Sequence, residues 1–186
     1  NDNRYVSYSA VGNAEFQQKG TIKFVLTPNY SGAPATKQIF FSAGSSSGFN
    51  KLIFAHFPTT GELVASVYAS NGALIMHANF GAWLPSPTAY DFAFELDIDN
   101  GATKLKINNV QLGATETNIG TRGPCDLFNV GQEILNPIYT SNFYMKYLVI
   151  YPTVYHPSSY VPGFNPLVYL SNYSPSQFSG RIIQTV

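Results

Sequence analysis

The most constraining feature of this 186-residue sequence is the alternation of apolar and polar side chains along most of its length. Period-two alternation is typical of β-strands, because successive side chains of a strand point to opposite faces. No segment has the spacing of a good amphipathic helix. The alternation predicts strands over residues 4–10, 20–28, 37–43, 50–57, 61–68, 72–80, 89–99, 102–112, 126–131 and 142–152.

Turn sequences separate these segments, among them "PNYSGAP", "AGSSSG", "TTG", "SNG" and "DNG". Many short strands joined by such turns favour an all-β jelly-roll sandwich of two antiparallel sheets. We expect residues 1–160 to form this sandwich. Residues 161–186 have weaker periodicity and several prolines, which predicts an arm that packs on the sandwich or on a neighbouring chain; "GRIIQTV" at its end could add a final strand.

The charge pattern argues against two classes of partner. Ten basic residues balance ten acidic ones and form no basic run, so nothing marks a nucleic-acid-binding surface. No apolar stretch approaches the roughly 20 residues that a membrane-spanning helix needs. Cys125 is the single cysteine, so we expect a small hydrophobic residue at a turn rather than a thiol nucleophile or a disulfide partner.

Three segments together resemble the concanavalin A-like, laminin-G-like superfamily over roughly residues 4–160. "GTIKFVLTPNYSG" is similar to its opening strand, "YDFAFELDIDNGATKLKINNVQLG" to its central hairpin and "SNFYMKYLVIYP" to its closing strand. The closing strand has Lys146 and Tyr147 where acidic residues are common, so calcium is not indicated and no cofactor is expected.

The phrases "TPNYSGAP…QIFF" and "TRGP…LFNVG" also look like lectin-like domains of phage and large DNA virus fibres and surface proteins. This resemblance implies a glycan or host-surface ligand, a virion-surface or extracellular location, and a possible homo-oligomer.

The acidic segment "ELDID" resembles the catalytic strand of retaining β-glucanases in the same superfamily. The resemblance places Glu95 at the nucleophile position, Asp97 in the middle and Asp99 in place of the acid/base glutamate. Asp99 is shorter than glutamate by one methylene and is followed at once by Asn-Gly, a strong hairpin signal. We therefore favour a half-exposed strand that enters a turn: Phe92, Phe94, Leu96 and Ile98 buried, and Glu95 and Asp97 at least partly open.

A second set of residues could bind a sugar. Trp83 is the only tryptophan, and an indole can stack on a sugar ring. Asn79 and His77 precede it on an expected strand and could hydrogen-bond sugar hydroxyls, with Tyr68 nearby. More broadly, one polar face could combine these residues in the following set: Glu62, Ser66, Tyr68, His77, Asn79, Glu95 and Asp97.

Histidines and glycosylation sequences add little to the assignment. His56 and His77 lie on neighbouring expected strands, but no third ligand is spaced to complete a metal site, and His156 lies in an expected turn. Asn29 and Asn172 each begin an Asn-Tyr-Ser acceptor sequence, which matters only in a secretory context.

Three functions stay open from the sequence. The favoured one is a non-catalytic lectin-like binding or adhesion module of a viral or phage surface structure. The alternatives are a glycoside hydrolase that uses Glu95, Asp97 and Asp99, and a structural capsid or fibre domain without a ligand.

Overall fold

The computed structural model describes residues 6–9, 18–125, 127–134, 141–151, 168–173 and 181–183. These residues form strands and connecting turns, without a helix. The strands are β1 (Val6–Ser9), β2 (Lys19–Pro28), β3 (Gln38–Gly44), β4 (Leu52–His56), β5 (Glu62–Tyr68), β6 (Leu74–Ala82), β7 (Tyr90–Asp97), β8 (Thr103–Ile107), β9 (Val110–Glu116), β10 (Leu127–Val130), β11 (Phe143–Tyr151), β12 (Val168–Tyr173) and β13 (Arg181–Ile183).

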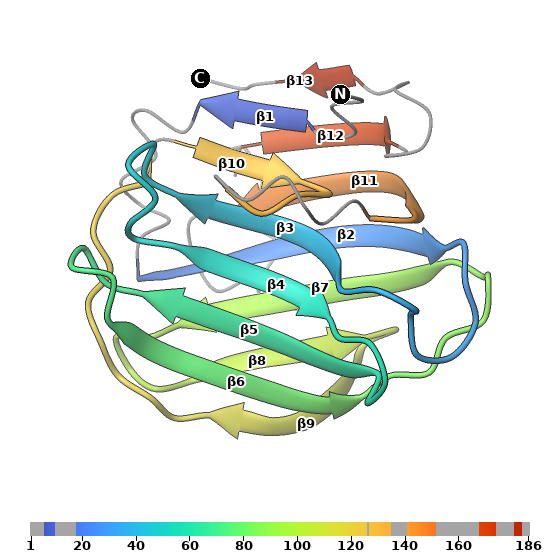
Figure 1. Cartoon of the computed structure of the whole chain (residues 1–186), viewed down its shortest axis with the longest axis horizontal. Coiled ribbons are helices and arrows are strands. Elements are labelled where there is room, and N and C mark those ends of the chain that lie inside the picture. Colours follow the sequence, from blue (N-terminus) through green and yellow to red (C-terminus); the bar gives the residue numbers. More distant parts are fainter. Residues whose placement is uncertain are drawn as a thin grey trace, which may run out of the picture.

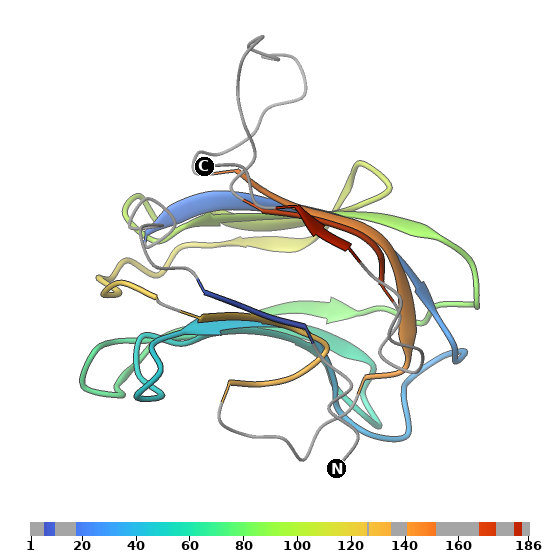
Figure 2. The same cartoon turned by 90° about the horizontal axis from the view of Figure 1, so that it is seen from above.

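The strands form two antiparallel sheets that lie face to face, as Figures 1 and 2 show. The six-stranded sheet has the order β1-β10-β3-β4-β5-β6, and the seven-stranded sheet has the order β13-β12-β11-β2-β7-β8-β9. This architecture confirms the expected all-β jelly-roll sandwich. Two segments of the expected arm, β12 and β13, extend the seven-stranded sheet beyond β11; the rest of residues 161–186 lies outside the described residues.

Phenylalanine side chains fill the space between the sheets. Phe24 on β2 stacks on Phe92 on β7 with ring centroids 4.7 Å apart, and Phe54 on β4 stacks on Phe94 at 5.4 Å. Phe40 contacts several of these rings edge-on, an arrangement that aromatic quadrupoles favour. The alternation seen in the sequence therefore directs large apolar side chains from both sheets into one core.

The prediction for β7 is correct for its apolar face and wrong for its acidic face. Phe92, Phe94, Leu96 and Ile98 are fully buried, which confirms the register of this strand. The expectation of an open acidic face is wrong, because Glu95 is only 2% exposed and Asp97 only 8%. Lys106 on the neighbouring strand covers Glu95, and Asp97 accepts hydrogen bonds from Asn100 in its own hairpin turn.

The segment expected as one strand over residues 102–112 is a hairpin instead. Asn108 and Asn109 both have positive φ angles, 51° and 65°, and Ile107 pairs directly with Val110. A two-residue turn with both central residues in the left-handed region fits the twist of a hairpin, and asparagine tolerates that region better than most residues. The turn separates β8 from β9 and leaves β9 at the end of the seven-stranded sheet.

Candidate functional site

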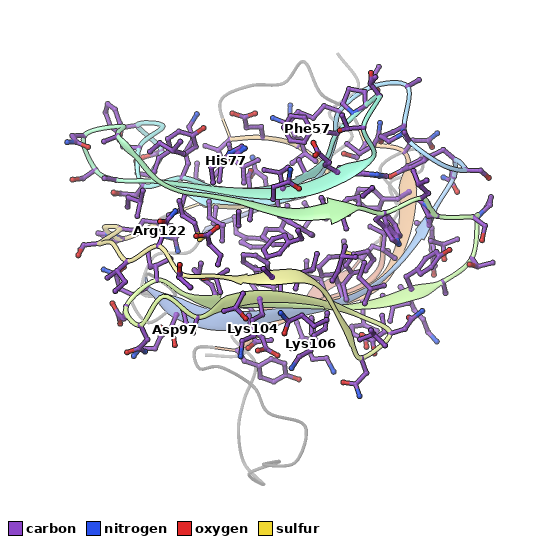
Figure 3. All side chains as sticks on the ribbon, turned by 90° about the horizontal axis from the view of Figure 1, so that it is seen from below. Phe57, His77, Asp97, Lys104, Lys106 and Arg122 are labelled. Carbon is purple, nitrogen blue, oxygen red and sulfur yellow. The ribbon has the colours of Figure 1, made fainter. Side chains whose placement is uncertain are left out.

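The outer face of the six-stranded sheet brings together most of the predicted sugar-binding residues. Inward residues of β5 and β6 enter the core, so the alternate residues Glu62, Ser66 and Tyr68 on β5 and His77 and Asn79 on β6 point outward. Ser66 and His77 are direct cross-strand partners. Figure 3 shows His77 on this outer face, on the side opposite to Asp97 and Lys106.

Hydrogen bonds hold four of these side chains in two pairs. The amide of Asn79 donates to Glu62 Oε1 at 2.8 Å, and its carbonyl oxygen accepts the Gly81 N–H at 2.9 Å. Ser66 Oγ lies 3.1 Å from His77 Nδ1. We call Glu62, Ser66, His77 and Asn79 the polar cluster.

Thr60 completes the environment of the Glu62 carboxylate. Its hydroxyl donates to Glu62 Oε2 at 3.0 Å, so each carboxylate oxygen accepts one hydrogen bond. The Asn79 bond, then the Thr60 bond, hold the pKa of Glu62 below its usual value, and a charge on His77 would act in the same direction. Sequence reasoning missed Thr60; a threonine two residues before an outward glutamate was the available signal.

An apolar strip continues this outer face beside the polar cluster. Tyr68 and Phe57 are half-buried and pack against Ile39, Ile53 and Ala55. Tyr68 follows Ser66 by two residues on the same side of β5, about 7 Å along the strand. Its ring therefore lies next to Ser66, whereas Phe57, whose backbone N–H donates to the Glu62 carbonyl at 2.9 Å, lies opposite Glu62.

The cations of this face lie near a carboxylate that comes from another segment. Lys37 and Lys51 lie 3.7 Å and 3.6 Å from the two carboxylate oxygens of Glu133. Residues 131–134 cross outside β3 and so bring Glu133 to this face (Figure 2). Ser42 on β3 holds this segment: its Oγ donates to the Gln132 carbonyl at 2.8 Å and accepts the Ile134 N–H at 3.0 Å. Lys37 also lies over the Phe57 ring, 5.1 Å from its centroid.

Trp83 is a core residue. It is 8% exposed, and Phe40, Phe92 and Tyr90 meet its ring edge-to-face at 5.1–6.1 Å. Little of the indole is left for a sugar to stack on, which argues against the platform expected from the sequence. The indole lies at the end of the aromatic core. The backbone N–H of Trp83 donates to the Gly61 carbonyl at 2.8 Å, which fixes the position of this residue.

His56 is also internal, with both ring nitrogens hydrogen-bonded. Nε2 lies 3.0 Å from the Gly61 carbonyl, which can only accept, so Nε2 carries the proton. Burial lowers the pKa of His56 to about 4, so the ring is neutral at pH 7 and Nδ1 accepts from the Tyr30 hydroxyl at 2.9 Å. Among the described residues, no three His, Cys, Asp or Glu side chains gather as a metal site would require. His156 and the side chain of Asn172 lie outside the described residues.

The three acidic residues of "ELDID" have separate partners on the other sheet. Glu95 accepts from Lys106 Nζ at 2.7 Å across β7 and β8. Asp97 accepts from the backbone and side chain of Asn100, which closes the hairpin turn, and Asp99 lies 3.4 Å from Lys19. Because Glu95 and Asp97 belong to the seven-stranded sheet, the single polar face expected from the sequence is wrong: the polar cluster and the acidic strand lie on opposite sides of the sandwich (Figure 3).

Cys125 and Arg122 are buried close to each other in the sequence. Cys125 is a buried thiol at the edge of the core, in accord with the expected small hydrophobic residue. Arg122 is fully buried three residues earlier, with Nη1 3.4 Å from the Asn50 carbonyl. Burial lowers the pKa of Arg122.

None of the described segments is a helix that could cross a membrane.

Comparison with solved structures identifies the fold class. No family model and no curated protein matches the chain. Similar folds include the CBM40 domain of the Ruminococcus gnavus IT-sialidase bound to α2,3-sialyllactose, with a TM-score of 0.58 and 13% identity over 82% of this chain and 88% of that one. The binding domain of botulinum neurotoxin DC in complex with SialylT has a TM-score of 0.60 and 11% identity, over 82% of this chain and 37% of that one.

A third similar structure is the heptameric SAP-like pentraxin from Limulus polyphemus, with a TM-score of 0.56 and 13% identity over 75% of this chain and 66% of that one. All three are lectin-like jelly-roll sandwiches. The sandwich described here has the same architecture.

Proposed function

We propose that this chain is a non-catalytic, lectin-like carbohydrate-binding or adhesion module that binds glycans on the outer face of the six-stranded sheet. The observation that carries the proposal is the polar cluster, which is held in place by hydrogen bonds and exposed beside Tyr68. It lies on a fold whose similar structures include two in complex with a sialylated ligand.

The chemistry of the polar cluster suits a sugar. A carboxylate with two oxygens can accept from two adjacent hydroxyls, and the amide of Asn79 keeps a second N–H after donating to Glu62. Phe57, opposite Glu62, and Tyr68, next to Ser66, supply half-buried rings for the apolar side of a pyranose. Because Glu62 and Asn79 already hold each other, the ligand meets groups that need little ordering, which favours binding.

Such a site binds weakly by itself. One partly exposed aromatic ring and a few hydrogen bonds correspond to about millimolar affinity, or roughly 4 kcal/mol. Linked copies can raise the avidity by about 10²–10⁴. The weak single site therefore favours a repeated display, as in a homo-oligomer.

We further propose a virion-surface or extracellular location, within a viral or phage surface structure. The support is the resemblance of "TPNYSGAP…QIFF" and "TRGP…LFNVG" to fibre and surface lectin-like domains, together with a composition low in charge and rich in aromatics. The need for several copies fits that setting.

The test is a glycan-array screen of the folded chain displayed in several copies, run beside a reducing-sugar release assay on β-glucans. We expect binding to a defined glycan set and no release of sugar. His77→Ala and Tyr68→Ala should each lower array binding at least about tenfold, whereas Asp91→Asn, an exposed change on the opposite sheet, should not. Absence of binding to every glycan would instead favour a structural capsid or fibre domain.

A further inference from the structure

Resting on the proposed function, we infer that the polar cluster selects neutral glycans and discriminates against glycans that end in a carboxylate, such as sialylated ones. The inference follows from the position of Glu62 among the side chains that would contact the ligand. It separates this chain from the two similar structures that are in complex with sialylated ligands.

The hairpin that carries the site has a negative local charge. Residues 62–82 contain one formally charged side chain, Glu62, and no lysine or arginine. The carboxylate stays ionised at neutral pH, because Asn79 and Thr60 donate to its two oxygens and stabilise the charged form. The polar cluster therefore presents a fixed anion to any ligand.

The lysines of the same face lie near another carboxylate. Lys37 and Lys51 lie within 4 Å of Glu133, which is 9% exposed and sits between them. Both lysines come from outside the β5–β6 hairpin, just before β3 and β4. A ligand carboxylate at the polar cluster would meet Glu62 without a lysine or arginine from β5 or β6.

Hydrogen-bonding capacity points the same way. A carboxylate only accepts, so Glu62 prefers ligand groups that donate, and neutral sugars offer hydroxyls on adjacent carbons. The donors that the polar cluster could give an anionic sugar include no lysine or arginine: they are the second N–H of Asn79, the Ser66 hydroxyl and the imidazole of His77. Like charges at a binding surface disfavour a partner, and two unit charges about 4 Å apart in water repel enough to lower affinity roughly fivefold.

The experiment uses matched glycan pairs. Each neutral oligosaccharide is printed beside the same oligosaccharide carrying a terminal α2,3- or α2,6-linked sialic acid. The immobilised, multivalent chain is tested at low and at high salt. We expect the neutral member of each bound pair to bind at least about fivefold better at low salt. The gap should narrow at high salt, because salt screens exposed charges.

Glu62→Gln separates charge from shape. Its amide keeps an acceptor oxygen and nearly the same volume but removes the negative charge, so the preference for neutral over sialylated members should shrink toward one. Asp91→Asn removes an exposed carboxylate from the opposite sheet and should leave the preference unchanged. Melting temperatures establish that both variants are folded.

The outcomes distinguish the inference from the proposed function. Sialylated members that bind as well as or better than their neutral partners overturn the inference and leave the glycan-binding function intact. An unchanged preference in Glu62→Gln also overturns it, because the discrimination would then come from another surface. Failure of every glycan to bind refutes the proposed function, and the inference with it.

Discussion

The Tyr30 hydroxyl lies 2.9 Å from Nδ1 of His56, in the wall of the core beside Trp83. Nδ1 can accept this bond only while the imidazole is neutral, whereas Nε2–H donates to the Gly61 carbonyl in either protonation state. The pair links the turn after β2 to the end of β4, and it makes the stability of the sandwich depend on pH.

The first prediction concerns acid. The pKa of His56 is lowered to about 4 in the folded chain, against about 6.5 when unfolded. Between these values the unfolded chain binds more protons, so the free energy of unfolding should fall as pH drops from 6.5 toward 4, by up to about 3 kcal/mol. Urea unfolding at pH 7, 5.5 and 4 measures it. His56→Gln should flatten this dependence, whereas His77→Gln, at an exposed position, should not; equal slopes in both variants would contradict the assignment.

The second prediction concerns Trp83. Because the ring is buried among Phe40, Phe92 and Tyr90, Trp83→Ala should destabilise the fold by roughly 3–5 kcal/mol, and Trp83→Phe by less. As the chain has one tryptophan, its fluorescence reports this residue alone: the emission should be blue-shifted and resist acrylamide quenching. Glycan binding per folded molecule should persist in Trp83→Phe. Red-shifted, easily quenched emission would restore Trp83 as a candidate platform.

The third prediction concerns the acidic strand. Glu95→Gln removes the buried charge that pairs with Lys106, so it should cost roughly 1–3 kcal/mol of stability. Glycan binding should stay within a few fold of wild type, because Glu95 lies on the sheet opposite to the polar cluster. Chemical denaturation and array binding measure the two effects. Release of sugar from a β-glucan by wild type, lost in this variant, would favour the glycoside hydrolase instead.

The fourth prediction compares two glycines with nearly the same backbone conformation. Gly113 on β9 has φ +69°, and a Cβ there would lie 2.4 Å from the Phe80 carbonyl oxygen on β6; Gly32 has φ +68° and nothing within 4 Å. Gly32→Ala should cost about 1 kcal/mol from backbone strain alone. Gly113→Ala should cost at least about 1–2 kcal/mol more, because the edges of the two sheets must separate. Equal losses in melting temperature would show that β6 and β9 lie farther apart.

Alternation by itself determined which side chains share a face along a regular strand such as β7, because the side-chain period of an extended chain is two. In β3 a register shift between Ile39 and Phe41 instead places the consecutive residues Phe40 and Phe41 in the same core. Phe92, Phe94 and Leu96 are buried as the sequence predicts, and the turn at Asn100 and Gly101 follows from local preferences. The pair Asn108–Asn109 carried a similar local signal, and its left-handed conformation splits one expected strand into two. These features depend on a few neighbouring residues.

Only the tertiary structure decided which faces meet. Period two gives each strand two faces but does not say which sheet the strand joins, and the pairings of β2 with β7 and β11 connect residues far apart in the chain. These pairings place Glu95 on the sheet opposite to Glu62. Likewise, burial of Trp83 depends on rings from β3 and β7. The sequence offered the residues of the polar cluster, and long-range packing determined which of them share a surface.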